Sequence, residues 1–377
     1  MTGLPLLLLI AQLPVDPSRI PEVKRSFETA PAQSTMKCAF QAVPPALNFS
    51  LQYETGYTLQ FPKGEFSSTG HGLDVALKVS SLTDALAPAF LANHVDLPDR
   101  AYAGNYVEVS GRFLMETGSY KIESLATDDS GRVCRGEWKV EVKSAVPVPK
   151  VSSAGGVTIF LDASPMNAQM VTLQPADVDM LRGTLLSLIR KFSTPSLRVV
   201  VFNAELEKEL LRLDPFNAGG FRLLSGTLSS LQLATVDYKS ASQRVGPAAF
   251  LTALLEREMA DRRQYAIFLG PQVRAHQTFA RNAFADHIQS FPTSFYLEYH
   301  PRGQSIGASF APAVRTPPQS QSAYGAEYPQ NLPLPAGSTH PNDLTPNTIE
   351  LLMRKINGHT LSFSTPEEFT HALDRIR

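Results

Sequence analysis

The period of the hydrophobic pattern changes once along this 377-residue chain, and that change constrains its fold more than any other feature. Residues 36–143 alternate apolar and polar side chains in short runs that glycine, proline and aspartate separate. In the run "CRGEWKVEVK", one face carries Cys134, Trp138, Val140 and Val142. Alternation with period two is typical of a strand that is buried on one face. We therefore expect residues 36–143 to form an antiparallel β-sandwich of the immunoglobulin-like type.

A different pattern begins after residue 156. Residues 144–156 ("SAVPVPKVSSAGG") form the expected linker, because proline favours extended backbone and the Ser/Gly end is flexible. Residues 157–377 alternate apolar runs such as "VTIFL" with amphipathic stretches such as "PADVDMLRGTLLSLIRKF". Buried strands that alternate with helices predict a parallel, doubly wound α/β sheet that is Rossmann-like. The expected fold class is therefore an α+β chain of two domains.

Two local signals refine the prediction for the second domain. In doubly wound sheets, ligands bind at the carboxyl ends of the strands, which is where Asp162 and Ser164 follow the run "VTIFL". Near the end of the chain, Thr365 followed by Glu368 predicts a capping box at the start of the last helix.

A proline-rich insertion, residues 300–345, interrupts the second domain. So long a stretch without secondary structure is unusual inside a compact domain. One interpretation is a mobile binding loop, in which Tyr324 and Tyr328 are the aromatic side chains that contact a partner. The other is a solvated detour of the chain without a binding role, and we favour this second interpretation.

Residues 1–35 have the pattern of an export signal followed by a flexible segment. The apolar run at residues 4–11 is too short to span a bilayer and fits the h-region of a secretory signal peptide. No Lys or Arg precedes the run, and Leu9 is large for a cleavage site that ends at Ala11, so a short apolar strand or tail is the alternative. We expect an extracytoplasmic protein, secreted or periplasmic, without a transmembrane segment.

The two cysteines, Cys38 and Cys134, both fall on the core-facing side of the alternating pattern. In an exported protein an even number of cysteines suggests a disulfide, which here would close a loop spanning most of the first domain. In a cytosolic protein the same residues would be two buried thiols. Both alternatives stay open at the level of sequence.

Charge and motif content narrow the classes of function. The 34 Lys and Arg residues balance 35 Asp and Glu residues, and no long basic block occurs. Proteins that bind nucleic acids usually carry a clustered basic surface, so we expect no nucleic-acid partner. The chain lacks a G-x-S-x-G elbow, an H-E-x-x-H motif, a phosphate-binding loop and a dinucleotide fingerprint. We therefore expect that the protein is not an enzyme, and a hydrolase is the less favoured alternative.

The second half of the chain resembles a von Willebrand factor A domain. The resemblance rests on "VTIFLDAS", "LRVVVFNAEL", "QYAIFLG" and the closing strand and helix. From about residue 36 onward, the chain is similar to secreted von Willebrand factor A-like proteins of acidobacteria, whose first domain carries a "GRVC…W" element like residues 131–134 with Trp138. The resemblance implies a metal-ion-dependent adhesion site, where an Asp-x-Ser-x-Ser loop, a Thr and a further Asp hold Mg²⁺ and a partner's carboxylate completes its coordination.

Matched to that motif, the chain keeps Asp162 and Ser164, and Thr235 is a candidate for the threonine. Met166 replaces the second serine, and Gly270 replaces the further aspartate. Mg²⁺ prefers hard oxygen ligands, for which a thioether is a poor substitute. The match therefore implies a degenerate adhesion site without a cofactor, and Mg²⁺ held by Asp162, Ser164 and Thr235 is the alternative. Without a metal, the oxygens of Asp162 and Ser164 would bond backbone amides of their own loop.

These features together predict a non-enzymatic, extracytoplasmic protein-binding module whose partner is another protein. The architecture and the signal-like N-terminus favour this interpretation. The alternative is a structural or assembly component of the cell envelope, in which the sandwich domain stacks with itself or with neighbouring molecules.

Overall fold

The computed structural model describes residues 6–11, 13–66, 71–97, 106–142, 147–148, 150–164, 173, 175–194, 196–230, 245–271, 279, 291–300 and 347–377. The chain divides into two compact units, Met1–Pro147 and Val148–Arg377. Three predicted site residues, Thr235, Tyr324 and Tyr328, lie outside the described residues, as does the proline-rich insertion after residue 300.

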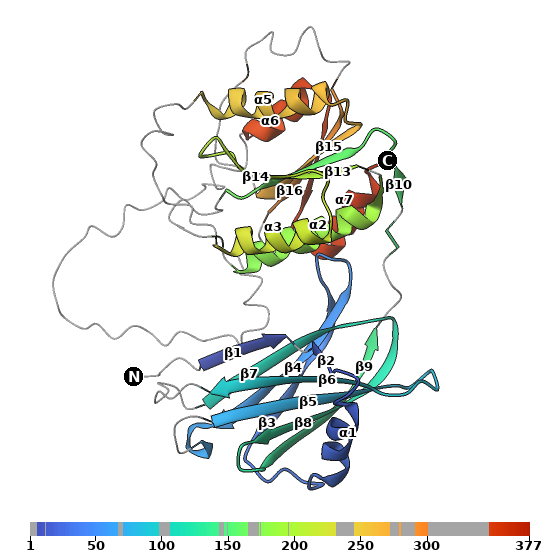
Figure 1. The fold of residues 1–377 in the computed structure, drawn as a ribbon, viewed down its shortest axis with the longest axis vertical. Helices are drawn as coiled ribbons and strands as arrows, with labels where there is room; N and C mark the ends of the chain where they lie inside the picture. The colour runs from blue at the N-terminus through green and yellow to red at the C-terminus, as the bar shows by residue number, and fades with distance from the viewer. Residues whose placement is uncertain are drawn as a thin grey trace, which may run out of the picture. The chain divides into compact units, whose positions relative to one another are not determined.

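In its described residues the first unit contains two β-sheets, helix α1 (Ile20–Thr29) and a short 3-10 helix at Lys63–Glu65 (Figure 1). The four-stranded sheet has the order β1-β7-β4-β3, and these strands span, in that order, Leu6–Ala11, Tyr106–Met115, Tyr53–Pro62 and Ala39–Leu47. The five-stranded sheet has the order β2-β6-β5-β8-β9, with the bounds Leu13–Pro14, Ala89–Leu97, His71–Ser81, Gly118–Asp128 and Val133–Val142. Among the described strands of this unit, neighbours pair antiparallel except β1 and β7, which are parallel.

The two sheets of the first unit bury a shared apolar core. In β9, Trp138, Val140 and Val142 are buried, whereas the charged residues between them are exposed. The other sheet contributes Tyr57 and Leu59 from β4, both fully buried in the same cluster. The period-two pattern therefore becomes burial of one face of each strand, because successive side chains of a strand point to opposite faces.

The N-terminal region differs from the flexible segment expected for residues 1–35. The apolar run forms β1, whose backbone pairs with β7, and helix α1 spans Ile20–Thr29. The guanidinium of Arg135 donates to the carbonyl oxygens of Phe27 and Ala30, each at 3.0 Å, and so holds the last turn of α1. These partners lie about a hundred residues away along the chain, where local pattern reading does not reach.

The linker is also shorter than the predicted 144–156. Val151–Ser152 forms β10, which pairs in parallel with β12 at Phe192–Ser193. The Gly155 amide donates to Gln264 Oε1 at 3.4 Å. Residues 151–156 therefore belong to the second unit. Composition alone could not distinguish a linker from a short strand at residues 151–152, because both have an extended backbone.

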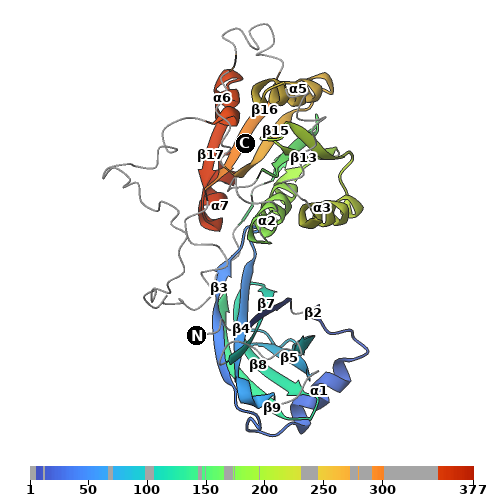
Figure 2. The ribbon, with the colours of Figure 1, turned by 90° about the vertical axis from the view of Figure 1, so that its left-hand side faces the viewer.

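The second unit is built on a six-stranded sheet with the order β14-β13-β11-β15-β16-β17 (Figure 2). In that order the strands span Lys208–Leu213, Leu197–Asn203, Val157–Asp162, Tyr265–Pro271, Thr293–Tyr299 and His359–Phe363. Neighbours are parallel except β14, which runs antiparallel to β13. From β11 the chain moves outward to β14, and then returns to β15 and moves outward to β17. The carboxyl ends of β11 and β15 therefore form the switch point at which such sheets bind ligands.

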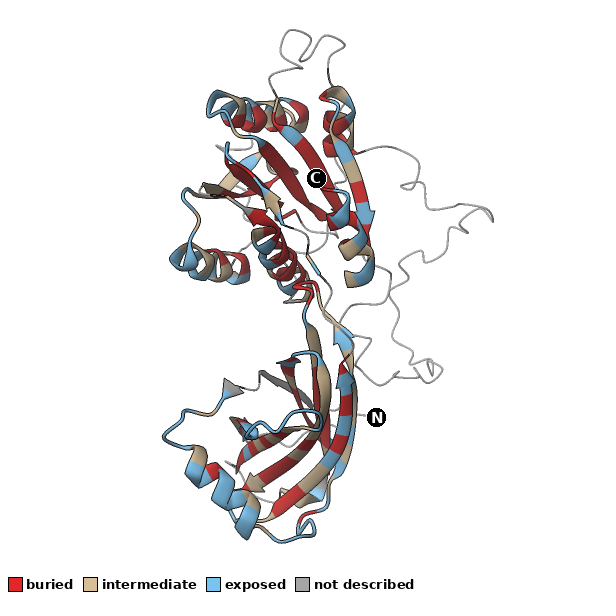
Figure 3. Ribbon diagram, turned by 90° about the vertical axis from the view of Figure 1, so that its right-hand side faces the viewer, coloured by how far each residue is buried: buried red, intermediate tan, exposed pale blue. Residues whose placement is uncertain are grey.

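Helices cover both faces of this sheet (Figure 1). One face carries α5 (Pro247–Ala260) and α6 (Thr348–Lys355), and the other carries α2 (Pro175–Lys191), α3 (Ala218–Ser230) and α7 (Pro366–Asp374). As a result β11 and β15 are buried at every residue (Figure 3). On the α5 side, the rings of Phe160 and Phe268 stack with centroids 4.5 Å apart, in one cluster with Leu251 and Leu254. Burial of both faces explains why these strands are continuous apolar runs.

Candidate functional site

Asp162 and Ser164 lie at the carboxyl end of β11, at the switch point of the sheet. Both residues are buried, with 1% and 2% of their surface exposed. The chain leaves the sheet here, and the amide of Ala163 still donates to the Phe202 carbonyl of β13 at 2.7 Å. The two polar side chains are therefore held beneath the turn rather than turned toward solvent.

One oxygen of the Asp162 carboxyl organises this turn. Its Oδ1 accepts hydrogen bonds from the Ser164 amide at 2.9 Å, the Ser164 hydroxyl at 2.6 Å and the Ala204 amide at 3.3 Å. The Ser164 hydroxyl oxygen in turn accepts from the Ala204 amide at 3.1 Å. The bonding expected within this loop is therefore present for Asp162, whereas the Ser164 hydroxyl oxygen accepts from an amide 40 residues away, just after β13.

Asn203, at the end of β13, completes the group, and sequence reasoning missed it. Its Oδ1 accepts from the Leu206 amide at 2.8 Å and lies 3.4 Å from the Ser164 hydroxyl. Its Nδ2 donates to the Ala163 carbonyl at 3.4 Å. The signal in the sequence is a polar residue directly after a buried strand, which is the same signal that identified Asp162.

The second oxygen of Asp162, Oδ2, is buried and has no hydrogen-bond partner among the described residues. Burial raises the pKa of the Asp162 carboxyl from 3.8 to about 7, although the hydrogen bonds from Ser164 and Ala204 oppose the rise. The negative charge of Glu205 adds to it. At neutral pH the carboxyl is therefore close to the midpoint of its titration.

Gly270, at the end of β15, packs directly against Asp162. A Cβ added to Gly270 would lie 2.6 Å from the Asp162 Cβ and 3.2 Å from the Asp162 carbonyl oxygen. Side-chain carbons do not approach so closely, so the two strands reach their spacing here only because residue 270 has no side chain. An aspartate at this position, as in the adhesion motif, would force β11 and β15 apart.

The described residues of the site do not fit the magnesium site that the resemblance implies. Asp162 Oδ1 already accepts three hydrogen bonds, and the hydroxyl of Ser164 is held between Asp162 and Ala204. That leaves Asp162 Oδ2 as the one oxygen of these two side chains without a hydrogen bond among the described residues, whereas the adhesion motif supplies oxygens from several side chains. Thr235 and Met166 lie outside the described residues.

Glu298 is a second buried carboxylate at the carboxyl end of this sheet, on β16. It pairs in register with Gly270 on β15 and with Ser362 on β17. Its Oε1 accepts from Asn347 Nδ2 at 2.6 Å, and its Oε2 accepts from Ser362 Oγ at 3.1 Å and lies 2.9 Å from His300 Nε2. His300 is the first residue of the proline-rich segment and its one described residue. Asn347 is the first described residue after that segment. Glu298 therefore joins the two places where that segment leaves and re-enters the described fold.

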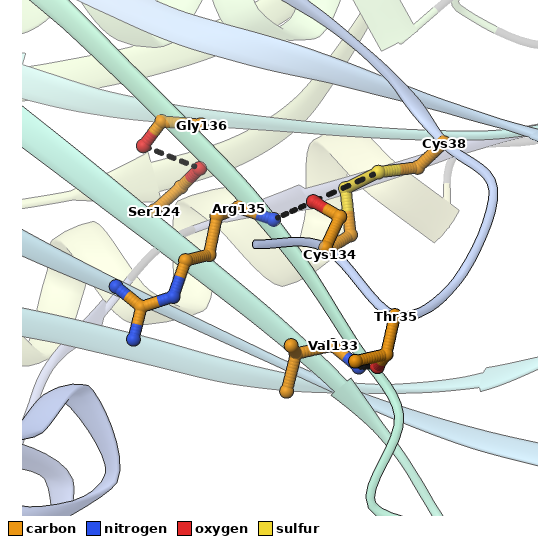
Figure 4. The surroundings of a disulfide bond; sticks show 8 residues. Thr35, Cys38, Ser124, Val133, Cys134, Arg135 and Gly136 are labelled. Carbon is orange, nitrogen blue, oxygen red and sulfur yellow. Dashed lines mark hydrogen bonds between the residues drawn. A yellow bond between two sulfur atoms is a disulfide. The ribbon is translucent and has the colours of Figure 1, made fainter. Parts of the chain in front are cut away.

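The two cysteines lie in the first unit and form a disulfide, with their Cα atoms 6.2 Å apart (Figure 4). Cys134 on β9 is fully buried, and Cys38 precedes β3 and is half-buried against the same core. The Thr35 hydroxyl oxygen accepts from the Val133 amide at 2.8 Å, so the segment before β3 runs beside β9. This group is structural and belongs to a different unit from Asp162.

In the described part of the chain, no helix is both long enough and apolar enough to cross a bilayer.

Comparisons with known proteins identify no family. No family model matches the sequence, and no curated protein matches it. Among solved structures, a superoxide reductase (neelaredoxin) from Ignicoccus hospitalis is 10% identical over 33% of this chain and 98% of that chain, with a TM-score of 0.20. A beta-glucosidase from Listeria innocua in complex with glucose is 13% identical over 29% of this chain and 16% of that chain, with a TM-score of 0.19. Likenesses this weak carry no argument about fold or activity, and the resemblance to von Willebrand factor A proteins stays a prediction.

Proposed function

We propose that this chain is a non-enzymatic module that binds another protein outside the cytoplasm, through a second unit of the von Willebrand factor A type whose adhesion site no longer holds a metal. One observation supports this most directly. Asp162 and Ser164 stand at the switch point of a sheet ordered β14-β13-β11-β15-β16-β17, and Gly270 ends the neighbouring strand, where the resemblance implies a metal-binding aspartate.

The hydrogen bonds at this point favour a rigid carboxyl end of β11 and β13. Asp162, Ser164 and Asn203 bond one another and the backbone of two neighbouring strands. A carboxyl end that is already rigid loses little conformational entropy when a partner docks. We therefore expect that binding of a partner at this end of the sheet does not depend on a divalent cation.

The chemistry of these groups argues against a hydrolase. A serine nucleophile needs an adjacent base and access to substrate. The Ser164 hydroxyl is 2% exposed and donates to a carboxyl that also accepts two amides. Glu298 is likewise buried and accepts from Asn347 and Ser362.

The test is affinity capture with the full chain as bait, from the extracytoplasmic fraction of the source organism. We expect a specific partner that is retained equally with Mg²⁺ and with EDTA. No specific partner, or a partner that EDTA releases and Mg²⁺ restores, would contradict the proposal. Recovery of the chain itself, with a molecular size that grows with concentration, would favour the envelope-assembly alternative.

A further inference from the structure

The strand β1 differs from the other described strands of the first unit in how it pairs. It runs parallel to β7 over six residues, from Leu6 opposite Val107 to Ala11 opposite Arg112. No other described strand pairs with its outer side, so it is the edge strand of the sheet β1-β7-β4-β3, as Figure 1 shows. On its inner side β7 pairs with β4 along its whole length without a register shift. If β1 leaves, the outer backbone groups of residues 107–112 lose their partners.

The other edges of the two sheets carry features that discourage strand pairing. Strand β3 contains Pro44 and Pro45, and its register shifts there. Strand β9 exposes Glu137, Lys139 and Glu141. Strand β2 is only two residues long. Prolines, irregular register, charges and short length are the usual ways in which a natural sheet blocks edge-to-edge pairing.

The edge of β7 has no proline, no irregular register and ten residues of length, although it carries two charged residues, Glu108 and Arg112. Residues 107–112 ("VEVSGR") contain no proline and no lysine, and pair on both sides in continuous register. Val107 and Val109 are buried in the core, and Glu108 is 4% exposed and accepts a hydrogen bond from Gln60 Nε2 at 3.3 Å. The strand is therefore rigid and regular, and what covers its outer side is β1.

The sequence of β1, "LLLLIA", is unusual for a permanent edge strand. It carries no charge and no proline, although edge strands normally include such residues. The same residues form the apolar run that the sequence predicts to be an export signal. Their removal on export would open a six-residue stretch of unpaired backbone on β7.

We propose that residues 107–112 of β7 form a strand-addition site for an extended, uncharged, apolar segment of a partner protein that runs parallel to β7, and that β1 occupies this site within the chain until it is removed or displaced. The pairing of β1 defines the occupant, because its register gives the direction and the length of the segment, and its sequence is uncharged and apolar. Backbone hydrogen bonds supply the affinity in such complexes, and alternate side chains supply the selectivity. The inference rests on the proposed function only in assuming that the partner is a protein.

The first experiment compares hydrogen exchange at residues 107–112 in the full chain and in Leu8→Pro. Proline lacks the backbone N–H and fixes φ, which disfavours pairing in a strand ladder, so we expect faster exchange at 107–112 and no change along β4. Leu8→Val is the matched control and should exchange like the wild type. Equal exchange in all three proteins would overturn the proposal. Should Leu8→Pro not fold, deletion of residues 6–11 uncovers the same edge, and failure of that variant to fold as well would also overturn it.

The second experiment adds a synthetic peptide with the sequence of residues 4–12, made soluble by a C-terminal lysine tag. We expect it to bind the Leu8→Pro chain about tenfold or more tightly than the wild-type chain, in which β1 competes for the site. Binding should restore slow exchange at 107–112, and a peptide with proline in place of its central leucine should not bind. Binding without protection of 107–112, or a dimer of full chains that exchange β1, would overturn the assignment of this site to a partner's strand. A further outcome separates this inference from the proposed function. If the wild type and Leu8→Pro capture a native partner equally, and the bound partner does not slow exchange at residues 107–112, the proposed function stands and this inference alone is refuted.

Discussion

Burial of the Asp162 carboxyl couples the stability of the second unit to pH. In the unfolded chain this carboxyl has its ordinary pKa of 3.8, and burial raises the pKa to about 7 in the folded protein. The folded state therefore holds the proton more tightly than the unfolded state. The stabilisation from this proton is fully present below about pH 4 and is lost as the pH rises through about 7.

We expect this group alone to lower the free energy of unfolding by about 2 kcal/mol between about pH 5.5 and about pH 8. Asp162→Asn cannot ionise but keeps an oxygen that accepts the hydrogen bonds of Ser164 and Ala204. Urea unfolding of both proteins at the two pH values, followed by circular dichroism of the helices, measures the effect. The wild type should lose stability relative to the variant as the pH rises, and a difference that is independent of pH would refute the expectation.

Gly270 should tolerate no side chain, because an added Cβ would lie 2.6 Å from the Cβ of Asp162. We expect Gly270→Ala to lower the free energy of unfolding by about 1–3 kcal/mol, the usual cost of overpacking. Gly226 in α3 is the matched control, since no atom lies within 4 Å of its added Cβ. Gly226→Ala should stabilise the helix by about 0.5–1 kcal/mol. Thermal unfolding of both variants measures these changes in stability. Equal changes in the two variants would show that the strands around Gly270 adjust to an added Cβ at little cost.

The local part of the candidate site could be predicted from the sequence, and the rest could not. Asp162 and Ser164 belong to one short motif, so their mutual bond follows from their spacing. Asn203 reaches Ser164 across 39 residues, and Ser362 reaches Glu298 across 64. Such contacts depend on which strands are neighbours in the sheet, and the sequence pattern does not specify this.

At the scale of whole elements, one side chain of α5 fastens that helix to three strands. Glu258 is fully buried. Its Oε2 accepts from the Thr158 hydroxyl of β11 at 2.6 Å and from Arg198 Nη1 of β13 at 2.7 Å, and its Oε1 accepts from Arg212 Nη1 of β14 at 2.9 Å. The carboxylate therefore compensates two guanidinium groups and fixes the position of α5 along the sheet.

We expect Glu258→Gln to lower the free energy of unfolding of the second unit by about 3 kcal/mol, because it removes the one fully buried counter-charge that Arg198 and Arg212 share. Glu256→Gln, on the exposed face of the same helix, should change it by about 0.5 kcal/mol or less. Chemical denaturation of the two variants provides the comparison. A small effect at Glu258 would mean that Asp214 and Asp261, which also pair with Arg198, compensate its loss.

Elements with local signals were predictable, and elements held by distant partners were not. The start of α7 is confirmed, because Thr365 Oγ1 accepts from the Glu368 amide at 3.2 Å, and Glu368 Oε2 accepts from the Ser364 amide at 2.7 Å. By contrast, α1 depends on Arg135, which is far away in the sequence. Strand β10 likewise depends on β12, with which it pairs.

At the scale of the molecule, the change in hydrophobic period predicted a division into two parts, and the chain does divide, at Pro147. The prediction was possible because side chains alternate with a period of two in strands and of about 3.6 in helices. Stretches of chain with these two patterns do not form one continuous layer. It did not include residues 1–35 in the first unit. Within this segment, β1 pairs with β7 and β2 pairs with β6. These tertiary contacts leave no trace in the period of the hydrophobic pattern.

The disulfide should stabilise the first unit and leave the second unchanged. The chain-entropy model for a bond across 96 residues gives about 4.7 kcal/mol. The chain has one tryptophan, Trp138, which is buried 4.8 Å from the ring of Phe40 in the core of the first unit. Unfolding followed by Trp138 fluorescence should therefore shift to lower denaturant on reduction. The helical circular dichroism of the second unit should not shift, and Cys38→Ser should reproduce the reduced protein without reductant.

The same bond decides how the first unit carries a mechanical load. Its two Cα atoms are 6.2 Å apart, although 96 residues separate them along the chain. Pulled straight, a segment of that length would extend to about 330 Å. Tension applied along the oxidised chain passes from Cys38 to Cys134 through the sulfur atoms, so the backbone between them cannot be pulled straight. In the oxidised chain this segment therefore adds almost no length under load, and reduction would turn it into a long tether.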